Sequence, residues 1–127
     1  MEKRRKSANF KQRIGAWGER QAETYLIERG LIPLERNYRT TYGEIDLVMQ
    51  QGEQLVFVEV KTRSNDRFGM PEESVTEQKK EHLTQAAQKY IEEHPAAPMD
   101  WRIDVVSIRR KNGAEPFEIT WFENAVA

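Results

Sequence analysis

Three carboxylates and a lysine stand at a spacing that could form a metal site: Glu44 and Asp46 in one short segment, Glu59 and Lys61 in the next. Within each pair one residue intervenes, and residues two apart share a face of a β-strand. If the two segments are neighbouring strands, cross-strand Cβ atoms lie about 4.5–5.5 Å apart. Two carboxylates at that distance repel unless a cation lies between them, and Mg²⁺ and Mn²⁺ prefer oxygen ligands. The spacing therefore indicates a divalent-metal site, with the lysine as a further positive charge.

A tight turn between the two segments determines how they align. Gly52-Glu53 separates them, and glycine at the first central position suits a two-residue type II′ hairpin turn. That turn pairs Gln51 with Gln54, and the rest of the register follows by counting back along both strands. The predicted cross-strand neighbours are Asp46 with Glu59 and Glu44 with Lys61.

The second segment has the pattern of a buried central strand that charged residues interrupt. Residues 55–58 and Val60 are apolar, whereas Glu59 and Lys61 are charged. Buried charges are costly unless they are paired or bound to a metal, and such a break in the pattern favours a functional site. The alternative is an amphipathic hairpin whose polar face is simply solvated.

Two predicted helices frame the strands that carry these residues. Apolar residues at helical spacing predict a first helix over residues 11–29, before Gly30, and Pro33 makes residues 31–35 an edge strand or an extended link. Further strands are predicted at residues 44–50, 54–63, 101–109 and 117–122, and a second helix at residues 73–93. The order α-β-β-β-α-β-β predicts an α/β fold with a mixed β-sheet flanked by helices.

Two motifs in these segments resemble the signature of a known family. GEIDLV at residues 43–48 and VFVEVKTR at 56–63 are similar to the YraN-like family of predicted endonucleases, which are related to Holliday junction resolvases within the PD-(D/E)XK nuclease superfamily. The likeness extends along most of the chain, and Ile45 replaces the proline of the superfamily motif. Its other parts are residues 15–19 with Ala22, residues 37–39, Val75 and Thr76 with Lys79, and residues 102–106.

The resemblance implies a restriction-endonuclease-like core, a Mg²⁺ or Mn²⁺ cofactor and a role for each matching residue. Asp46 and Glu59 would be metal ligands, the backbone carbonyl of Val60 could also ligate, and Lys61 would be the catalytic lysine. Glu19 matches the glutamate that resolvase-like enzymes carry on their first helix.

Glu19 also has support from the residues around it. Gly15, Gly18 and Ala22 form a stripe of small residues on the first helix, although an interior glycine costs about 1 kcal/mol relative to alanine. Close approach of the helix to the sheet would explain the glycines and bring Glu19 near the carboxylates. The alternative is an ordinary exposed helix glutamate.

Length and composition set the frame for these residues. The 127 residues favour a single domain, 1–127, and a mix of 38% hydrophobic and 32% charged residues is compatible with a folded core. The chain has no cysteine, which excludes disulfides, thiolate metal sites and a cysteine nucleophile. No apolar run is long enough to cross a membrane, so a cytoplasmic protein that does not contact the membrane is expected.

Charge predicts contact with nucleic acid only locally. The net charge is −1, but residues 1–10 contain four basic residues and one acidic residue, and they are predicted to form a basic, flexible arm. Arg39, Arg63 and Lys79 are expected to bind nucleic acid along the approach to the carboxylates, with DNA favoured over RNA.

Three functions stay open at this point. The leading hypothesis is a metal-dependent endonuclease that hydrolyses phosphodiester bonds, with branched DNA as one substrate class. The second is a non-catalytic nucleic-acid-binding module on the same fold. The third is a protein-interaction domain with a solvated hairpin. Whether the chain forms a homodimer, as resolvase-like enzymes do, is equally open, because it rests on analogy of fold.

Overall fold

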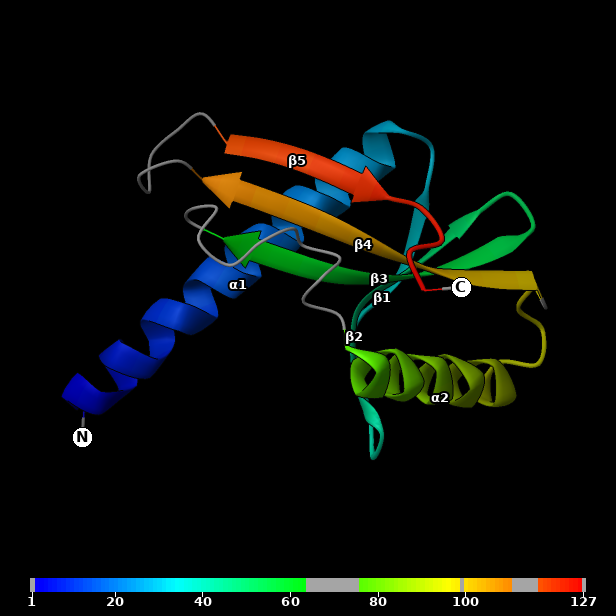
Figure 1. Ribbon diagram of the computed structural model, residues 1–127, viewed down its shortest axis with the longest axis horizontal. Coiled ribbons are helices and arrows are strands. Elements are labelled where there is room, and N and C mark those ends of the chain that lie inside the picture. Colours follow the sequence, from blue (N-terminus) through cyan, green and yellow to red (C-terminus); the bar gives the residue numbers. More distant parts are fainter. Residues whose placement is uncertain (1, 64–75, 99, 111–116, 127) are drawn as a thin grey trace.

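Two helices cover opposite faces of a five-stranded sheet (Figure 1). The computed structural model describes residues 2–63, 76–98, 100–110 and 117–126, with the backbone alone for residues 2–11. The helices are α1 (Glu2–Glu28) and α2 (Glu77–Glu93). The strands are β1 (Ile32–Thr40), β2 (Gly43–Gln51), β3 (Gln54–Arg63), β4 (Asp100–Arg110) and β5 (Phe117–Phe122).

The sheet is mixed and follows the chain in the order β1-β2-β3-β4-β5. Neighbouring strands are antiparallel except β3 and β4, which run parallel because α2 provides the crossover between them. The predicted fold class and the order α-β-β-β-α-β-β are confirmed.

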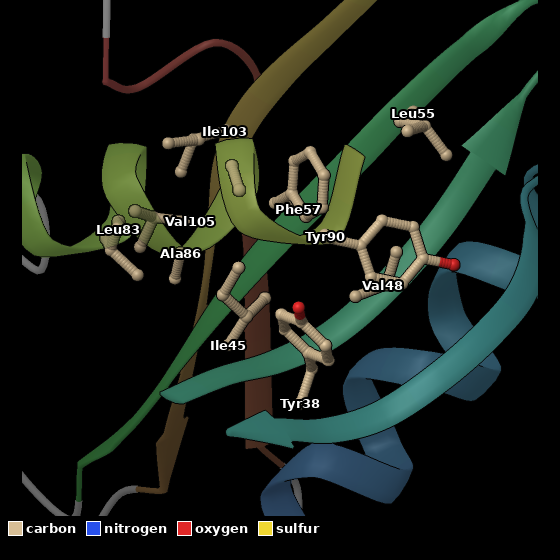
Figure 2. Packing of buried hydrophobic residues seen from close by; sticks show 11 residues of the cluster. Tyr38, Ile45, Val48, Leu55, Phe57, Leu83, Ala86, Tyr90, Ile103 and Val105 are labelled. Atoms are coloured by element: carbon tan, nitrogen blue, oxygen red, sulfur yellow. The ribbon is translucent and has the colours of Figure 1, made fainter. Parts of the chain in front are cut away.

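Side chains alternate between the two faces along β3, so this strand contributes to both halves of the core. Val56 and Val58 pack with α1, and Leu55 and Phe57 pack with α2. On the α2 side, Tyr90 meets the rings of Tyr38 and Phe57 edge-on, with ring centroids 5.2 and 5.6 Å apart (Figure 2). A charged side chain on a strand with both faces covered is shielded from solvent, and this is costly unless the charge is paired. Glu59 and Lys61, towards the end of β3, are therefore unusual for such a strand.

The β2–β3 hairpin has the predicted turn and register. Gln51 pairs with Gln54, and Gly52 adopts a φ of 59°, in the left-handed region that favours glycine. Glu53 has no positive φ, which distinguishes a type II′ turn from a type I′ turn. The paired register continues to Leu47 and Val58 without a shift.

Several predicted boundaries are wrong, for identifiable reasons. Helix α1 begins at Glu2 instead of residue 11, so it includes most of the segment predicted as a flexible arm. Strand β1 extends to Thr40 instead of ending at residue 35, because it pairs along nearly the whole of β2. Helix α2 begins at Glu77 instead of residue 73, since Thr76 caps it by accepting a hydrogen bond from the Lys79 backbone N–H at 3.1 Å. Val75, predicted on the buried face of that helix, lies outside the described residues.

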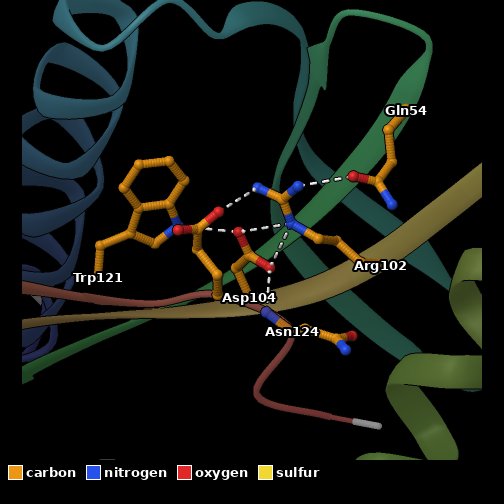
Figure 3. Close-up of polar contacts among 6 residues, drawn as sticks. Gln54, Arg102, Asp104, Trp121 and Asn124 are labelled. Atoms are coloured by element: carbon orange, nitrogen blue, oxygen red, sulfur yellow. Dashed lines mark hydrogen bonds and ion pairs between the residues drawn. The ribbon is translucent and has the colours of Figure 1, made fainter.

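A buried polar network ties β4 to β5 (Figure 3). Asp104 is fully buried, and its carboxylate accepts hydrogen bonds from Arg102 Nε at 3.0 and 3.2 Å, Trp121 Nε1 at 2.8 Å and the Asn124 backbone N–H at 2.8 Å. Arg102 also donates to Gln54 of β3 at 2.6 Å. A buried carboxylate with this many donors is satisfied within the fold, so its position indicates a structural role.

None of the helices in the described part of the chain combines the length and the apolar character that crossing a membrane requires.

Candidate functional site

Strands β2 and β3 part at the position of the predicted carboxylates. Their paired register ends at Leu47 and Val58, and the next residues on the two strands are Asp46 and Glu59. Beyond this point β2 continues beside β1, and β3 continues beside β4. The antiparallel pairing predicted from the hairpin is confirmed, and it places the two carboxylates together at the point where the strands separate.

The Asp46 carboxylate reaches across to β3. Its Oδ2 accepts a hydrogen bond from the Val60 backbone N–H at 2.8 Å. Burial, followed by the negative charge of Glu59, raises the pKa of Asp46 to about 8, although the Val60 N–H lowers it. Hydrogen bonding between the two carboxyl groups and the charge of Glu19 raise the pKa further. Asp46 therefore lies in a negative field that a cation would relieve.

Glu59 lies in a different field, because two lysines compensate its charge. The Glu59 residue is only 4% exposed. Its Oε2 lies 3.0 Å from the Nζ of Lys79, on α2, and 3.4 Å from the Nζ of Lys61, on β3. Lys61 thus shares a face with Glu59, as predicted, and the helix contributes a second cation to the same oxygen.

Glu44 does not occupy its predicted place. The β2–β3 ladder ends before it could lie opposite Lys61, and it pairs instead with Arg39 of β1. Its Oε1 lies 3.5 Å from the Arg39 Nε. The prediction was wrong because it extended a regular hairpin past the point where the strands diverge.

Close packing of α1 on β3 brings Glu19 to the carboxylates. A Cβ on Gly18 would lie 3.2 Å from the Cβ of Thr62 and would collide with its Oγ1. Ala22, one turn further along, is fully buried. The predicted reason for the glycines is confirmed for Gly18 and wrong for Gly15, where an added Cβ would meet nothing within 4 Å.

Glu19 itself is held by a residue of β1. Its Oε1 accepts a hydrogen bond from Asn37 Nδ2 at 3.0 Å. Burial raises the pKa of Glu19, the Asn37 bond lowers it, and the negative charges of Glu44 and Glu59 raise it. Glu19 therefore interacts electrostatically with the same group of carboxylates as Asp46.

The three basic residues predicted to bind nucleic acid have different surroundings. Lys79 lies at the site itself, against Glu59. The Arg39 side chain is 82% exposed on the edge strand β1. Arg63 is half-buried at the end of β3.

The oxygen atoms available as ligands at the site fit a hard divalent cation. Asp46 and Glu59 offer carboxylate oxygens, the Val60 carbonyl belongs to the same strand segment, and oxygen-only sites with several waters are typical of Mg²⁺ and Mn²⁺. Among the described residues, no three histidine, aspartate or glutamate side chains stand together as a group that could hold a metal ion. The arrangement accordingly fits a site with two carboxylates, completed by water or substrate.

Asn37 is the residue of the site to which the sequence assigned no role. It has a φ of 51°, in the left-handed region, and it faces Asp46 between the pairs Arg36–Leu47 and Tyr38–Ile45, which keep the same register. Asparagine tolerates this conformation better than most residues, but a single asparagine within a polar segment is too common to predict it.

The fold and the site define an α/β protein with acidic residues gathered where its sheet opens. The sequence profile of the uncharacterised protein family UPF0102 matches residues 18–108. A UPF0102 protein of Nocardioides sp. is 45% identical over 104 residues, which cover 82% of this chain and 84% of that protein. A UPF0102 protein of Vibrio campbellii is 42% identical over 119 residues, which cover 92% and 94%. The chain belongs to the UPF0102 family, which confirms the predicted YraN-like membership.

Proposed function

We propose that this protein is a metal-dependent endonuclease that hydrolyses phosphodiester bonds in nucleic acid, with DNA favoured over RNA. The observation that carries the proposal is the proximity of the Asp46 and Glu59 carboxylates where β2 and β3 part, with the Lys61 ammonium 3.4 Å from the Glu59 carboxylate. Asp46, Glu59 and Lys61 are the residues that match the family signature in the sequence motifs. In the fold, these three side chains lie close together.

In the proposed site, Asp46, Glu59 and the Val60 carbonyl hold Mg²⁺ or Mn²⁺. When bound, the metal polarises a phosphate oxygen and lowers the pKa of a water ligand. The Lys61 ammonium cannot ligate a cation, so its role is to stabilise negative charge on the phosphate or to orient the attacking water. Glu19 lies beside this group as a further catalytic carboxylate.

The remaining parts of the proposal concern the substrate. Arg39, Arg63 and Lys79 bind the phosphate backbone, and the basic residues 1–10 act as an auxiliary contact to nucleic acid. Action as a cytoplasmic homodimer on branched DNA belongs to the same proposal and rests on analogy with resolvase-like enzymes.

One observation favours a second candidate, a non-catalytic nucleic-acid-binding module. Lys61 and Lys79 both contact Glu59 Oε2, so the Glu59 charge is compensated without a metal. In that case the two lysines would only neutralise the Glu59 carboxylate, and the protein would bind nucleic acid without cutting it.

A cleavage assay separates the two candidates. Labelled duplex, flap, four-way junction and single-stranded DNA, with matching RNA, are incubated with the protein in Mn²⁺, Mg²⁺ or EDTA. The endonuclease is supported if at least one substrate is cut in metal and not in EDTA, and if Asp46→Asn loses cleavage while Asp100→Asn, an exposed control on β4, keeps it. Binding with no cleavage of any substrate in metal favours the non-catalytic module.

A further inference from the structure

Asn37 interrupts the β1–β2 ladder directly beside Asp46. Arg36 pairs with Leu47 and Tyr38 pairs with Ile45, so the two residues left between these pairs are Asn37 and Asp46. Asn37 has a φ of 51°, whereas its neighbours in β1 have no positive φ. The irregularity in β1 therefore lies opposite the proposed metal ligand.

The alternation of side chains between the two faces of β2 also breaks at Asp46. Ile45 and Val48 both belong to the α2 side of the core although they are three residues apart, and Leu47 belongs to the α1 side. Strict alternation would put Ile45 and Val48 on opposite faces. The alternation therefore slips by one residue around Asp46, where its side chain turns to the Val60 N–H.

The Asn37 side chain connects this irregularity to α1. Its Nδ2 donates to Glu19 Oε1 at 3.0 Å, and both residues line a surface cavity of about 520 Å³ between α1 and β1. The Asn37 side chain thus contacts Glu19 on α1, and the Asn37 backbone faces Asp46 on β2.

We propose that Asn37 is a positioning residue, which directs the Glu19 carboxylate toward the metal site through its side-chain amide. This inference rests on the proposed metal site at Asp46 and Glu59. Glu19 influences the bound metal through a water ligand, and Asn37 acts through Glu19. Partners that orient ligating groups in this way typically affect metal affinity by about 10–100-fold when they are removed.

The test uses Asn37→Gly, because glycine adopts the left-handed backbone without strain and removes the side chain that carries the amide. Mn²⁺ affinity is measured by calorimetric titration for wild type, Asn37→Gly, Glu19→Gln and the double variant. The matched control is Asn124→Gly, at another asparagine with a left-handed φ, of 52°, whose hydrogen bond to Asp104 comes from its backbone N–H. The Mn²⁺-induced rise in melting temperature, taken relative to each variant without metal, checks the affinities independently of stability.

We expect Asn37→Gly to weaken Mn²⁺ binding about 10-fold and Asn124→Gly to leave it unchanged. The double variant should bind no more weakly than Glu19→Gln alone, because the asparagine acts through that carboxylate. Unchanged affinity in Asn37→Gly, or losses that add in the double variant, would overturn the inference while leaving the metal site intact. A wild-type protein that binds no Mn²⁺ would overturn the proposed function, and this inference with it.

Discussion

At the scale of residues, the two central carboxylates differ in what surrounds them. Two ammonium groups lie within 3.4 Å of Glu59, whereas Asp46 has one backbone N–H and the negative charges of Glu59 and Glu19. A proton or a metal ion at Asp46 relieves the same repulsion, so the two should compete. This competition makes the stability of the metal-free protein depend on pH.

The first prediction is that the metal-free protein loses stability relative to Asp46→Asn as the pH rises toward 8. The pKa of Asp46 is raised from 3.8 to about 8 in the folded protein, so the folded state holds a proton that the unfolded state has released. The stabilisation is complete below pH 4 and is lost as the pH rises to about 8. The asparagine does not titrate, and its Oδ1 can still accept from the Val60 N–H.

Denaturant unfolding in EDTA at several pH values between 5 and 8.5 measures this difference. We expect the free-energy gap to shift by roughly 1–3 kcal/mol in favour of the variant, within the limit of about 1.4 kcal/mol per pH unit for one proton. Asp100→Asn serves as the exposed control. Parallel stability curves for wild type and Asp46→Asn would contradict the raised pKa.

The second prediction separates catalysis from metal binding at Lys61. Lys61→Met should lower the cleavage rate at least about 100-fold, because it removes the positive charge proposed to act on phosphate or water. Mn²⁺ affinity should stay the same or rise, since a cation that competes for Glu59 is lost while Lys79 remains at 3.0 Å. Cleavage and calorimetric titration are compared with Lys80→Met on α2. Wild-type cleavage by Lys61→Met would show that the lysine is not part of the chemistry.

At the scale of elements, the site is the place where local patterns stop predicting the structure. The bounds of β3 and the hairpin register were predictable because an apolar run and a glycine turn are local signals. The full length of β1 was not, because Pro33 and the polar residues that follow it give no alternation, and the strand depends on pairing with β2. The slip at Asn37 and Asp46 depends on contacts between elements, so the sequence could place Asp46 beside Glu59 but not predict its bond to Val60.

The third prediction concerns the close contact between α1 and β3. Gly18→Ala should lower the free energy of unfolding by about 1–3 kcal/mol, because the new methyl group collides with Thr62. Gly15→Ala is the matched control on the same helix, where the methyl group meets nothing within 4 Å. It should be neutral or stabilise by up to about 1 kcal/mol through helix propensity. Equal effects of the two substitutions in denaturant unfolding would contradict the packing that brings Glu19 to the site.

At the scale of the whole molecule, two polar clusters in the sheet have different roles, one between β4 and β5 and one where β2 and β3 separate. The Asp104 network is satisfied by donors from β4, from β5 and from the backbone that follows β5, and it holds the β4–β5 edge together. The opening between β2 and β3 gathers carboxylates and lysines from α1, the sheet and α2. Nucleic acid that reaches this opening must overcome a local negative field, so cationic side chains around it should matter for binding.

The fourth prediction tests those cations. A triple alanine variant at Arg39, Arg63 and Lys79 should bind duplex DNA more weakly in EDTA, and the slope of log affinity against log salt should decrease by up to about 3. A variant with alanine at Arg29, Lys80 and Lys89 removes the same charge elsewhere and should have a smaller effect. Fluorescence anisotropy over a range of salt concentrations measures both. If the two triple variants bind alike, the assigned residues contribute only their general charge.

The central claim, that Asp46 and Glu59 hold a divalent metal, is tested most directly by calorimetric titration of Mn²⁺ into the purified protein. Wild type, Asp46→Asn and Asp100→Asn are compared at pH 7.5. The proposed site predicts saturable binding to wild type and Asp100→Asn, with affinity at least about 10-fold weaker or lost in Asp46→Asn. Equal Mn²⁺ affinity in all three proteins, or no binding to any of them, would contradict the claim.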